Sequence, residues 1–125
     1  MEKKLVYIAD DEINICNIMK SFLIKEGYEV ETFYDGRSIL EAFQIRPADM
    51  LIIDIMMPEI DGYSLCSFIR QKSSVPIIIV SAKDTEPDKI AGLTLGSDDY
   101  LTKPFSPMEL IASVTLLSLS AKTAS

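Results

Sequence analysis

Five polar residues with complementary chemistry end or directly follow short apolar runs in this sequence. They are the carboxylates of Asp10, Asp11 and Asp54, the hydroxyl of Ser81 and the ammonium of Lys103. Three carboxylates in one pocket raise one another's pKa, so a cation is expected between them. Hard oxygen ligands in a water-accessible pocket favour Mg²⁺, which keeps several of its waters. The set therefore predicts a metal-assisted phosphoryl-transfer site.

Each of these signals is weak when it is taken alone. An Asp-Asp pair often starts a helix, a serine often ends a strand, and Lys-Pro is a common loop dipeptide. Asp54 is harder to explain structurally, because a carboxylate that closes the run MLIID costs desolvation energy unless another group compensates. The prediction depends on all five residues meeting in space.

Such a meeting requires the apolar runs to form one parallel sheet. The runs alternate with segments of helical period and cover Leu5–Ala9, Glu29–Phe33, Met50–Ile53, Pro76–Val80 and Tyr100–Thr102. VYIA, LIID and IIIV are apolar on both sides of the pleat, which is typical of central parallel strands. The predicted fold is α/β, a doubly wound five-stranded parallel sheet with five helices on its two faces. The carboxyl ends of such strands share one edge, where these sheets bind ligands.

Helix signals fill the gaps between the predicted strands. The first helix carries apolar residues at the spacing of one helical face, namely Ile15, Ile18, Met19, Phe22 and Leu23. Gly27 is placed to end that helix. The last helix is predicted to begin at Ser106, a capping residue that precedes a proline at the first helical position.

Composition narrows the range of functions. The chain has 125 residues, 48% of them hydrophobic, which suits one domain with a core. Its net charge of −7 argues against this chain alone binding a nucleic-acid backbone. The absence of histidine excludes Ser-His-Asp catalysis and a phosphohistidine within the chain. Cys16 and Cys66 have no metal-ligand spacing and are predicted to be reduced core residues.

Targeting and domain limits are also suggested by the sequence. No apolar run is long enough to cross a membrane, and we expect a cytoplasmic protein. From about Thr115 the chain is rich in serine, alanine and threonine, and we expect this end to fray. Residues 1–118 are predicted to form the domain, and 119–125 a polar tail or the start of a linker.

Four segments, taken together, resemble the receiver domain of two-component response regulators. They are ADDE, LIIDIMMPEIDGYSL, IIIVSAK and GSDDYLTKPFSPMEL, and they occur in the family's order and spacing over essentially the whole chain. The end of the last segment further resembles OmpR/PhoB-type transcriptional regulators. The resemblance implies a flavodoxin-like topology with strand order 2-1-3-4-5.

The resemblance also implies how the phosphoryl group is handled. Asp54 would accept it from a sensor histidine kinase, and Ser81 and Lys103 would contact it. On activation Ser81 would move toward the new oxygens, and Tyr100 would fill the vacated space from an exposed rotamer. The Lys103–Pro104 peptide is expected to be cis.

The metal site implied by the resemblance uses oxygen ligands around Asp54. The carboxylates of Asp11 and Asp54 and the backbone carbonyl of Met56 would bind Mg²⁺, and Asp10 would act through water. DNA would be contacted only through an effector domain absent from this chain, and no membrane contact is expected.

Phosphorylation is expected to promote a weak homodimer. The resemblance places its surface on the fourth helix, fifth strand and fifth helix, at Lys89, Ile90, Leu93, Asp99, Glu109 and Ile111. Ser113 stands where a basic residue is expected to pair with Asp99, and no charged residue occurs between Leu110 and Ala121. Association should therefore be weaker than is usual for the subfamily.

Three other functions fit parts of the pattern. A phosphohydrolase of the haloacid-dehalogenase type also uses an aspartate nucleophile, but it needs an acid two residues later, where this chain has Met56. A flavodoxin-like FMN binder would need a Ser/Thr/Gly-rich loop after the first strand, where three acids stand here. A receiver-like module that only contacts proteins would not need the acids, the hydroxyl and the lysine together.

Overall fold

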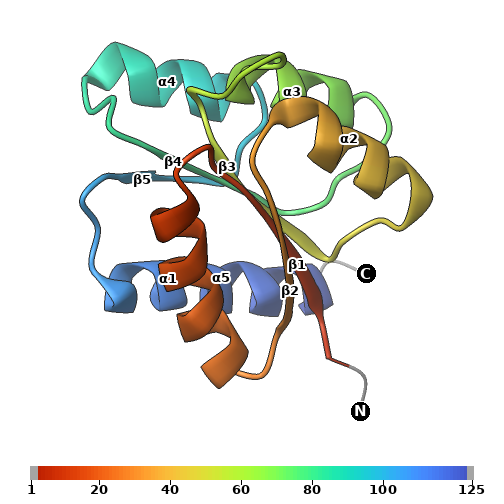
Figure 1. The fold of residues 1–125 in the computed structure, drawn as a ribbon. Coiled ribbons are helices and arrows are strands. Elements are labelled where there is room, and N and C mark those ends of the chain that lie inside the picture. Colours follow the sequence, from red (N-terminus) through yellow and green to blue (C-terminus); the bar gives the residue numbers. More distant parts are fainter. Residues whose placement is uncertain (1–2, 124–125) are drawn as a thin grey trace.

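The computed structural model describes residues 3–123, in which five strands and five helices alternate along the chain (Figure 1). The strands are β1 (Leu5–Ala9), β2 (Glu29–Phe33), β3 (Met50–Asp54), β4 (Ile77–Ser81) and β5 (Asp99–Thr102). The helices are α1 (Ile13–Lys25), α2 (Gly36–Ile45), α3 (Gly62–Arg70), α4 (Glu86–Thr94) and α5 (Pro107–Thr123). Each predicted strand is confirmed to within one residue at either end.

All strand pairs are parallel, and the sheet order is β2-β1-β3-β4-β5, as expected. Helices α1 and α5 cover one face of the sheet, and α2, α3 and α4 cover the other (Figure 1). Strands β1, β3 and β4 are buried along their whole length, as their continuous apolar runs predict. The doubly wound α/β prediction is confirmed.

Two hydrophobic clusters hold the helices to the sheet. On one face Ile39, Leu65 and Cys66 pack against β1, β3 and β4, and on the other Cys16 and Met19 pack against the same strands. Both cysteines are free and buried, in line with their prediction as core residues.

The structure differs from the sequence predictions at two helices. Ile18, expected on the buried face of α1, is 52% exposed, because the buried face is centred on Cys16, Met19 and Leu23. Helix α5 continues to Thr123, so the segment from Thr115, expected to fray, is helical as far as it is described. The expected boundary at 118/119 falls inside this helix, and Ala124 and Ser125 lie outside the described residues. No helix within residues 3–123 is long and apolar enough to cross a bilayer.

Candidate functional site

The carboxyl edge of the sheet brings four of the five polar residues together. Asp10 follows β1, Asp54 ends β3, Ser81 ends β4 and Lys103 follows β5. Because β1, β3 and β4 are neighbours in the sheet, their ends present adjacent side chains without any help from long loops. Asp10 and Ser81 are fully buried, and Asp54 is 5% exposed.

Lys103 is the cation between the buried carboxylates. Its Nζ lies 2.7 Å from Asp10 Oδ2 and 3.3 Å from Asp54 Oδ2. Glu12 Oε1 lies at 3.9 Å from the same nitrogen. The Lys103–Pro104 peptide that follows is cis, as expected. An ammonium held this close to Asp54 is placed to neutralise negative charge that arrives on that carboxylate.

Burial and neighbouring charges shift the ionisation of both groups. Desolvation, followed by the charge of Asp10, raises the pKa of Asp54 to about 6, although Lys103 acts in the opposite direction. Burial alone would lower the pKa of Lys103, but its hydrogen bond to Asp10 and the charges of Asp54, Asp10 and Glu12 outweigh burial and raise it. At neutral pH the Asp54 carboxylate is therefore mostly ionised and lies beside the positively charged Lys103.

Asp11 points to solvent and supplies the exposed part of the site. It lines an open pocket of ≈ 590 Å³ together with Met56, Asp61, Tyr63 and Lys83. Met56 has a 62% exposed side chain, and its backbone N–H lies 3.4 Å from Asp54 Oδ1, which accepts from it. Asp54 itself does not line this pocket, but Ile55 and Met56, which directly follow it in the chain, do.

The carboxylates of Asp10, Asp11 and Glu12 form the described cluster best suited to a cation. One oxygen from each lies within 4.8 Å of the others. Hard oxygens at a water-accessible position fit Mg²⁺. Glu12 was not among the predicted ligands, although the run ADDE contains it. Asp54, a predicted ligand, is not a member of this cluster, and its Oδ2 accepts a hydrogen bond from Lys103 Nζ at 3.3 Å.

Ser81 ends β4, and Tyr100 on β5 reaches the β4–α4 connection with its hydroxyl. Ser81 Oγ accepts a hydrogen bond from the backbone N–H of Lys83 at 3.2 Å, and the Tyr100 hydroxyl donates to the Lys83 carbonyl at 2.7 Å. Tyr100 is half-buried, and its ring lies so close to Gly92 that a Cβ there would come within 3.0 Å of Cδ2. Tyr100 thus packs half-buried against α4, and its expected movement on activation stays a prediction.

Gly62 allows α3 to begin against the end of β3. A Cβ at this position would lie 2.5 Å from the carbonyl oxygen of Asp54 and 2.6 Å from Ile55 Cα, both backbone atoms that cannot move aside cheaply. The Gly62 N–H donates to the Ile55 carbonyl at 2.8 Å. The glycine of the sequence DGY therefore fixes the wall of the pocket beside Asp54.

The predicted dimer surface is partly solvent-exposed in the single chain. Ile90 and Leu93 on α4 are 61% and 49% exposed, and Glu109 on α5 is exposed. Lys89, Asp99 and Ile111 are half-buried. The Asp99 carboxylate accepts a hydrogen bond from the Ser113 hydroxyl, so this acid has a partner within the chain.

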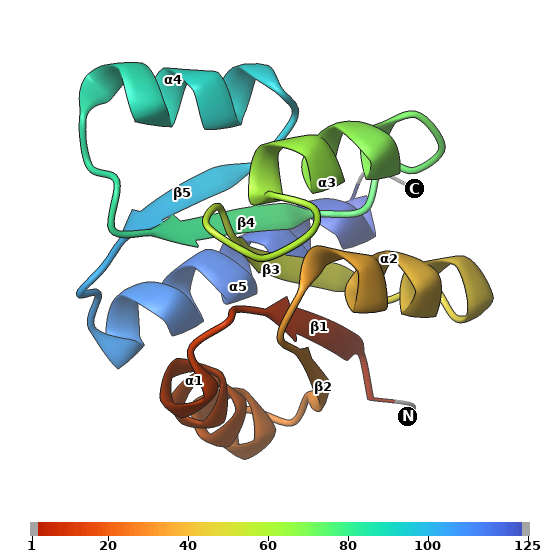
Figure 2. The same ribbon diagram turned by 45° about the horizontal axis from the view of Figure 1, so that its top comes forward.

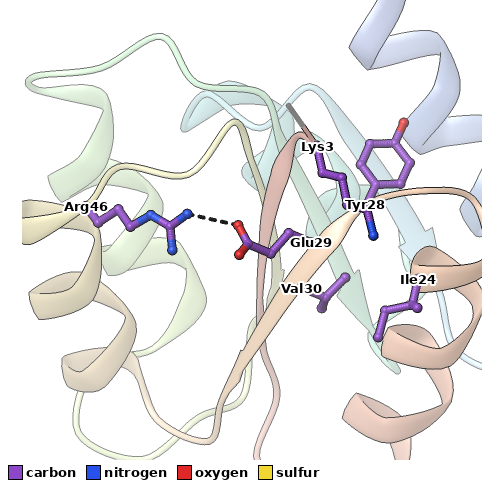
Figure 3. Close-up of a pocket in the computed structure, with 6 residues that line it drawn as sticks. All are labelled: Lys3, Ile24, Tyr28, Glu29, Val30 and Arg46. Carbon is purple, nitrogen blue, oxygen red and sulfur yellow. Dashed lines mark hydrogen bonds and ion pairs between the residues drawn. The ribbon is translucent and has the colours of Figure 1, made fainter. Parts of the chain in front are cut away.

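A second pocket lies at the opposite end of the sheet, lined by Lys3, Ile24, Tyr28, Glu29, Val30 and Arg46 (Figure 3). Its volume is ≈ 620 Å³. The ion pair between Arg46 and Glu29, 2.9 Å long, crosses it with both side chains about half-exposed. Because no buried polar groups converge there, size alone does not make it the functional site.

The comparisons with known proteins agree on one family. The model of the response regulator receiver domain matches residues 6–115. Regulatory protein VanR of Enterococcus faecium is 46% identical over 109 residues, which cover 87% of this chain and 47% of that protein. The uncharacterized transcriptional regulatory protein YclJ of Bacillus subtilis is 42% identical over 109 residues, covering 87% of this chain and 48% of the relative.

A solved structure agrees with these sequence relatives. The receiver domain of the Francisella response regulator 1452 superposes with a TM-score of 0.91 at 40% identity, covering 95% of this chain and 99% of that one. The chain spans about half the length of the curated relatives it matches.

Proposed function

Because the chain belongs to the response regulator receiver domain family, we propose that Asp54 accepts a phosphoryl group from a sensor histidine kinase. The observation that carries this proposal is the position of the Lys103 ammonium, which contacts the buried carboxylates of both Asp10 and Asp54. The curated relatives are transcriptional regulators about twice as long, so we propose that the phosphorylated domain controls transcription through an effector domain. This signalling takes place in the cytoplasm.

The proposed reaction is an in-line displacement at phosphorus. A carboxylate oxygen of Asp54 forms a bond to phosphorus as the bond from phosphorus to the kinase's histidine nitrogen breaks. The electron pair of the broken bond stays on that nitrogen, which is left as an imidazole. Lys103 neutralises charge on the transferred oxygens, and the Ser81 hydroxyl donates a hydrogen bond to one of them.

Magnesium is proposed as the metal of this site. Asp11, Asp54 and the backbone carbonyl of Met56 would hold it, with Asp10 acting through water, and Glu12 lies close enough to Asp10 and Asp11 to contribute. When bound, the ion supplies positive charge to the phosphoryl oxygens, which is the main requirement of phosphoryl transfer.

We also propose the limits of the functional unit. Residues 1–118 would form the receiver domain, and 119–125 a polar tail or the start of a linker. The continuation of α5 to Thr123 suits a linker that leaves the domain as a helix.

Incubation with Mg²⁺ and acetyl phosphate tests the phosphoacceptor. We expect the intact mass of the wild type to rise by one phosphoryl group, and the Asp54→Asn variant to remain unmodified because an amide is not a nucleophile here. Asp61→Asn is the matched control, since it removes a carboxylate from the same pocket and retains its capping role for α3. An equal adduct on Asp54→Asn would exclude Asp54 as the acceptor.

The acyl phosphate is expected to persist for minutes or longer. Met56 and Lys83, two residues after Asp54 and Ser81, line the pocket and offer no amide or carboxylate to position an attacking water. The domain would thus remove its own phosphoryl group only slowly. Loss of the adduct can be followed by mass after acetyl phosphate is removed, and Met56→Asn should shorten its half-life several-fold. A wild-type half-life of seconds would contradict this.

Phosphorylation is expected to yield a weak dimer through α4, β5 and α5. Ile90, Leu93 and Ile111 would supply apolar contact, while Lys89 and Glu109 form one pair across the interface. An exposed pair contributes about 0–1 kcal/mol and a symmetric dimer contains it twice, so Lys89→Glu should weaken the dimer by up to about 30-fold.

Sedimentation velocity with and without a beryllofluoride mimic measures this association. Lys72→Glu is the control, because it makes the same charge change on an exposed residue after α3. A tight dimer in both states, or one that Lys89→Glu leaves unchanged, would show that the chain associates through another surface.

A further inference from the structure

Helix α4 is the helix least fixed by burial among those whose buried residues are described. Gly92 is its only buried residue, and Ile90 and Leu93 point largely to solvent. Figure 2 shows α4 beside α3 and over β5. With so little apolar surface removed from water, the position of α4 depends on a few directed hydrogen bonds.

Two tyrosine hydroxyls hold the first turn of α4 and the connection that leads into it. Tyr63, in the first turn of α3, donates to the carbonyl of Asp88 at 3.2 Å. Tyr100, on β5, donates to the carbonyl of Lys83 at 2.7 Å. Burial raises the pKa of both phenols, that of Tyr100 to about 12, so each remains a donor at neutral pH.

The carboxyl-terminal end of α4 is tied down by a charged group instead. Arg70 Nε donates to the Gly96 carbonyl at 2.8 Å, and its Nη2 lies 2.9 Å from Asp98 Oδ2. The Cys66 thiol adds a contact to the Leu95 carbonyl at 3.5 Å. Hydrogen bonds to charged groups are stronger than those between neutral groups, so the amino-terminal end is the one more easily released.

Tyr63 also belongs to the wall of the pocket at the phosphoacceptor site. It lines this pocket with Asp11, Met56 and Lys83, and it lines a smaller groove of ≈ 300 Å³ with Phe68 and Leu95. The same side chain therefore lines the pocket that Ile55 and Met56, directly after Asp54, also line, and it contacts the backbone of α4.

We propose that Tyr63 is a positioning residue that couples the pocket beside Asp54 to the amino-terminal end of α4. It does so together with Tyr100, whose side chain is its neighbour, but through α3 rather than β5. A change in the pocket that displaces the Tyr63 ring breaks its bond to Asp88 and frees this end of α4, while Arg70 keeps the other end in place. The coupling part of this inference rests on the proposed function, whereas the contact itself does not.

Hydrogen exchange of the unphosphorylated Tyr63→Phe variant tests the contact. The substitution keeps the ring and removes only the donor. We expect amides in the first half of α4 to exchange about fivefold faster, the factor that one lost neutral hydrogen bond gives, and amides near Gly96 to be unchanged. Tyr34→Phe is the control, because it removes the hydroxyl of an exposed tyrosine far from α4. Unchanged exchange in α4, or a uniform increase over the whole chain, would overturn the contact.

Beryllofluoride with Mg²⁺ tests the coupling. We expect Tyr63→Phe to bind the mimic, seen as a rise in melting temperature, but to show less than half of the wild-type change in α4 exchange. The variants Tyr63→Phe and Tyr100→Phe should also be non-additive when combined, since both hydroxyls hold the same segment. A full α4 response in Tyr63→Phe would overturn the coupling alone. If the wild type does not bind the mimic, the proposed function fails and the coupling with it.

Discussion

Replacing Lys103 by methionine is expected to slow phosphorylation of Asp54 by acetyl phosphate about 100- to 1,000-fold. The ammonium lies 3.3 Å from Asp54 Oδ2 and is largely screened from water, so its loss removes a positive charge from the place where negative charge arrives. A second effect follows, since the pKa of Asp54 is raised by burial and by Asp10 and is held down by Lys103. Without the lysine that pKa should rise further, which leaves less of the carboxylate ionised at neutral pH.

These two effects can be separated by the pH dependence of the rate. A higher pKa at Asp54 would be compensated by raising the pH, whereas the loss of charge neutralisation would not. We therefore expect the rate of Lys103→Met, followed by intact mass, to recover only in part at higher pH. Lys83→Met serves as the control, because it removes an exposed lysine from the rim of the same pocket. A Lys103→Met rate within a few-fold of the wild type would contradict the role given to Lys103.

The position of this site could be predicted from the sequence because it depends on strand ends. Apolar runs such as MLIID define where a parallel strand stops, and the topology then places Asp10, Asp54 and Ser81 along one edge. Such an argument needs only the period of the pattern and the handedness of the connections. The strand ends alone do not define which atoms meet. The structure adds that Lys103 Nζ contacts a carboxylate oxygen of both Asp10 and Asp54.

Side-chain contacts between distant elements could not be predicted in the same way. Tyr63 reaches Asp88 across 25 residues, and Arg70 reaches Gly96 across 26. Nothing in the local sequence specifies these partners, since each depends on how far one helix lies from the next. The packed rotamer of Tyr100 has the same origin, because it requires the space left by Gly92 on α4. The sequence names Tyr100 and Gly92 but does not show that they touch.

Removal of Mg²⁺ is expected to lower the melting temperature of the wild type by about 10 °C. Saturation at 100-fold over the dissociation constant stabilises the native state by about 2.7 kcal/mol, which corresponds to a shift of this size for a domain of this length. The ion would relieve repulsion at this site, where Asp11 and Asp54 would bind it and where Asp10, Asp11 and Glu12 bring three carboxylate oxygens within 4.8 Å of one another. Melts with EDTA and with millimolar Mg²⁺ measure the difference, and Asp11→Ala should reduce it, whereas Asp49→Ala, at the other end of β3, should not.

The pH dependence of the metal-free protein gives an independent check on Asp54. Its folded-state pKa of about 6 lies above its ordinary value of 3.8, so the folded state binds the proton more tightly than the unfolded state. This contribution to stability is fully present below about pH 4 and is lost as the pH rises through 6. In EDTA, Asp54→Asn should therefore melt at a higher temperature than the wild type at pH 7, by an amount that shrinks toward pH 4.

The Asp54→Asn variant should also gain less stability from Mg²⁺, because it lacks one of the proposed ligands. A metal-free wild type as stable at pH 7 as Asp54→Asn would mean that the carboxylate of Asp54 is not destabilised by burial. A bound cation would then have no burial cost of the Asp54 carboxylate to offset.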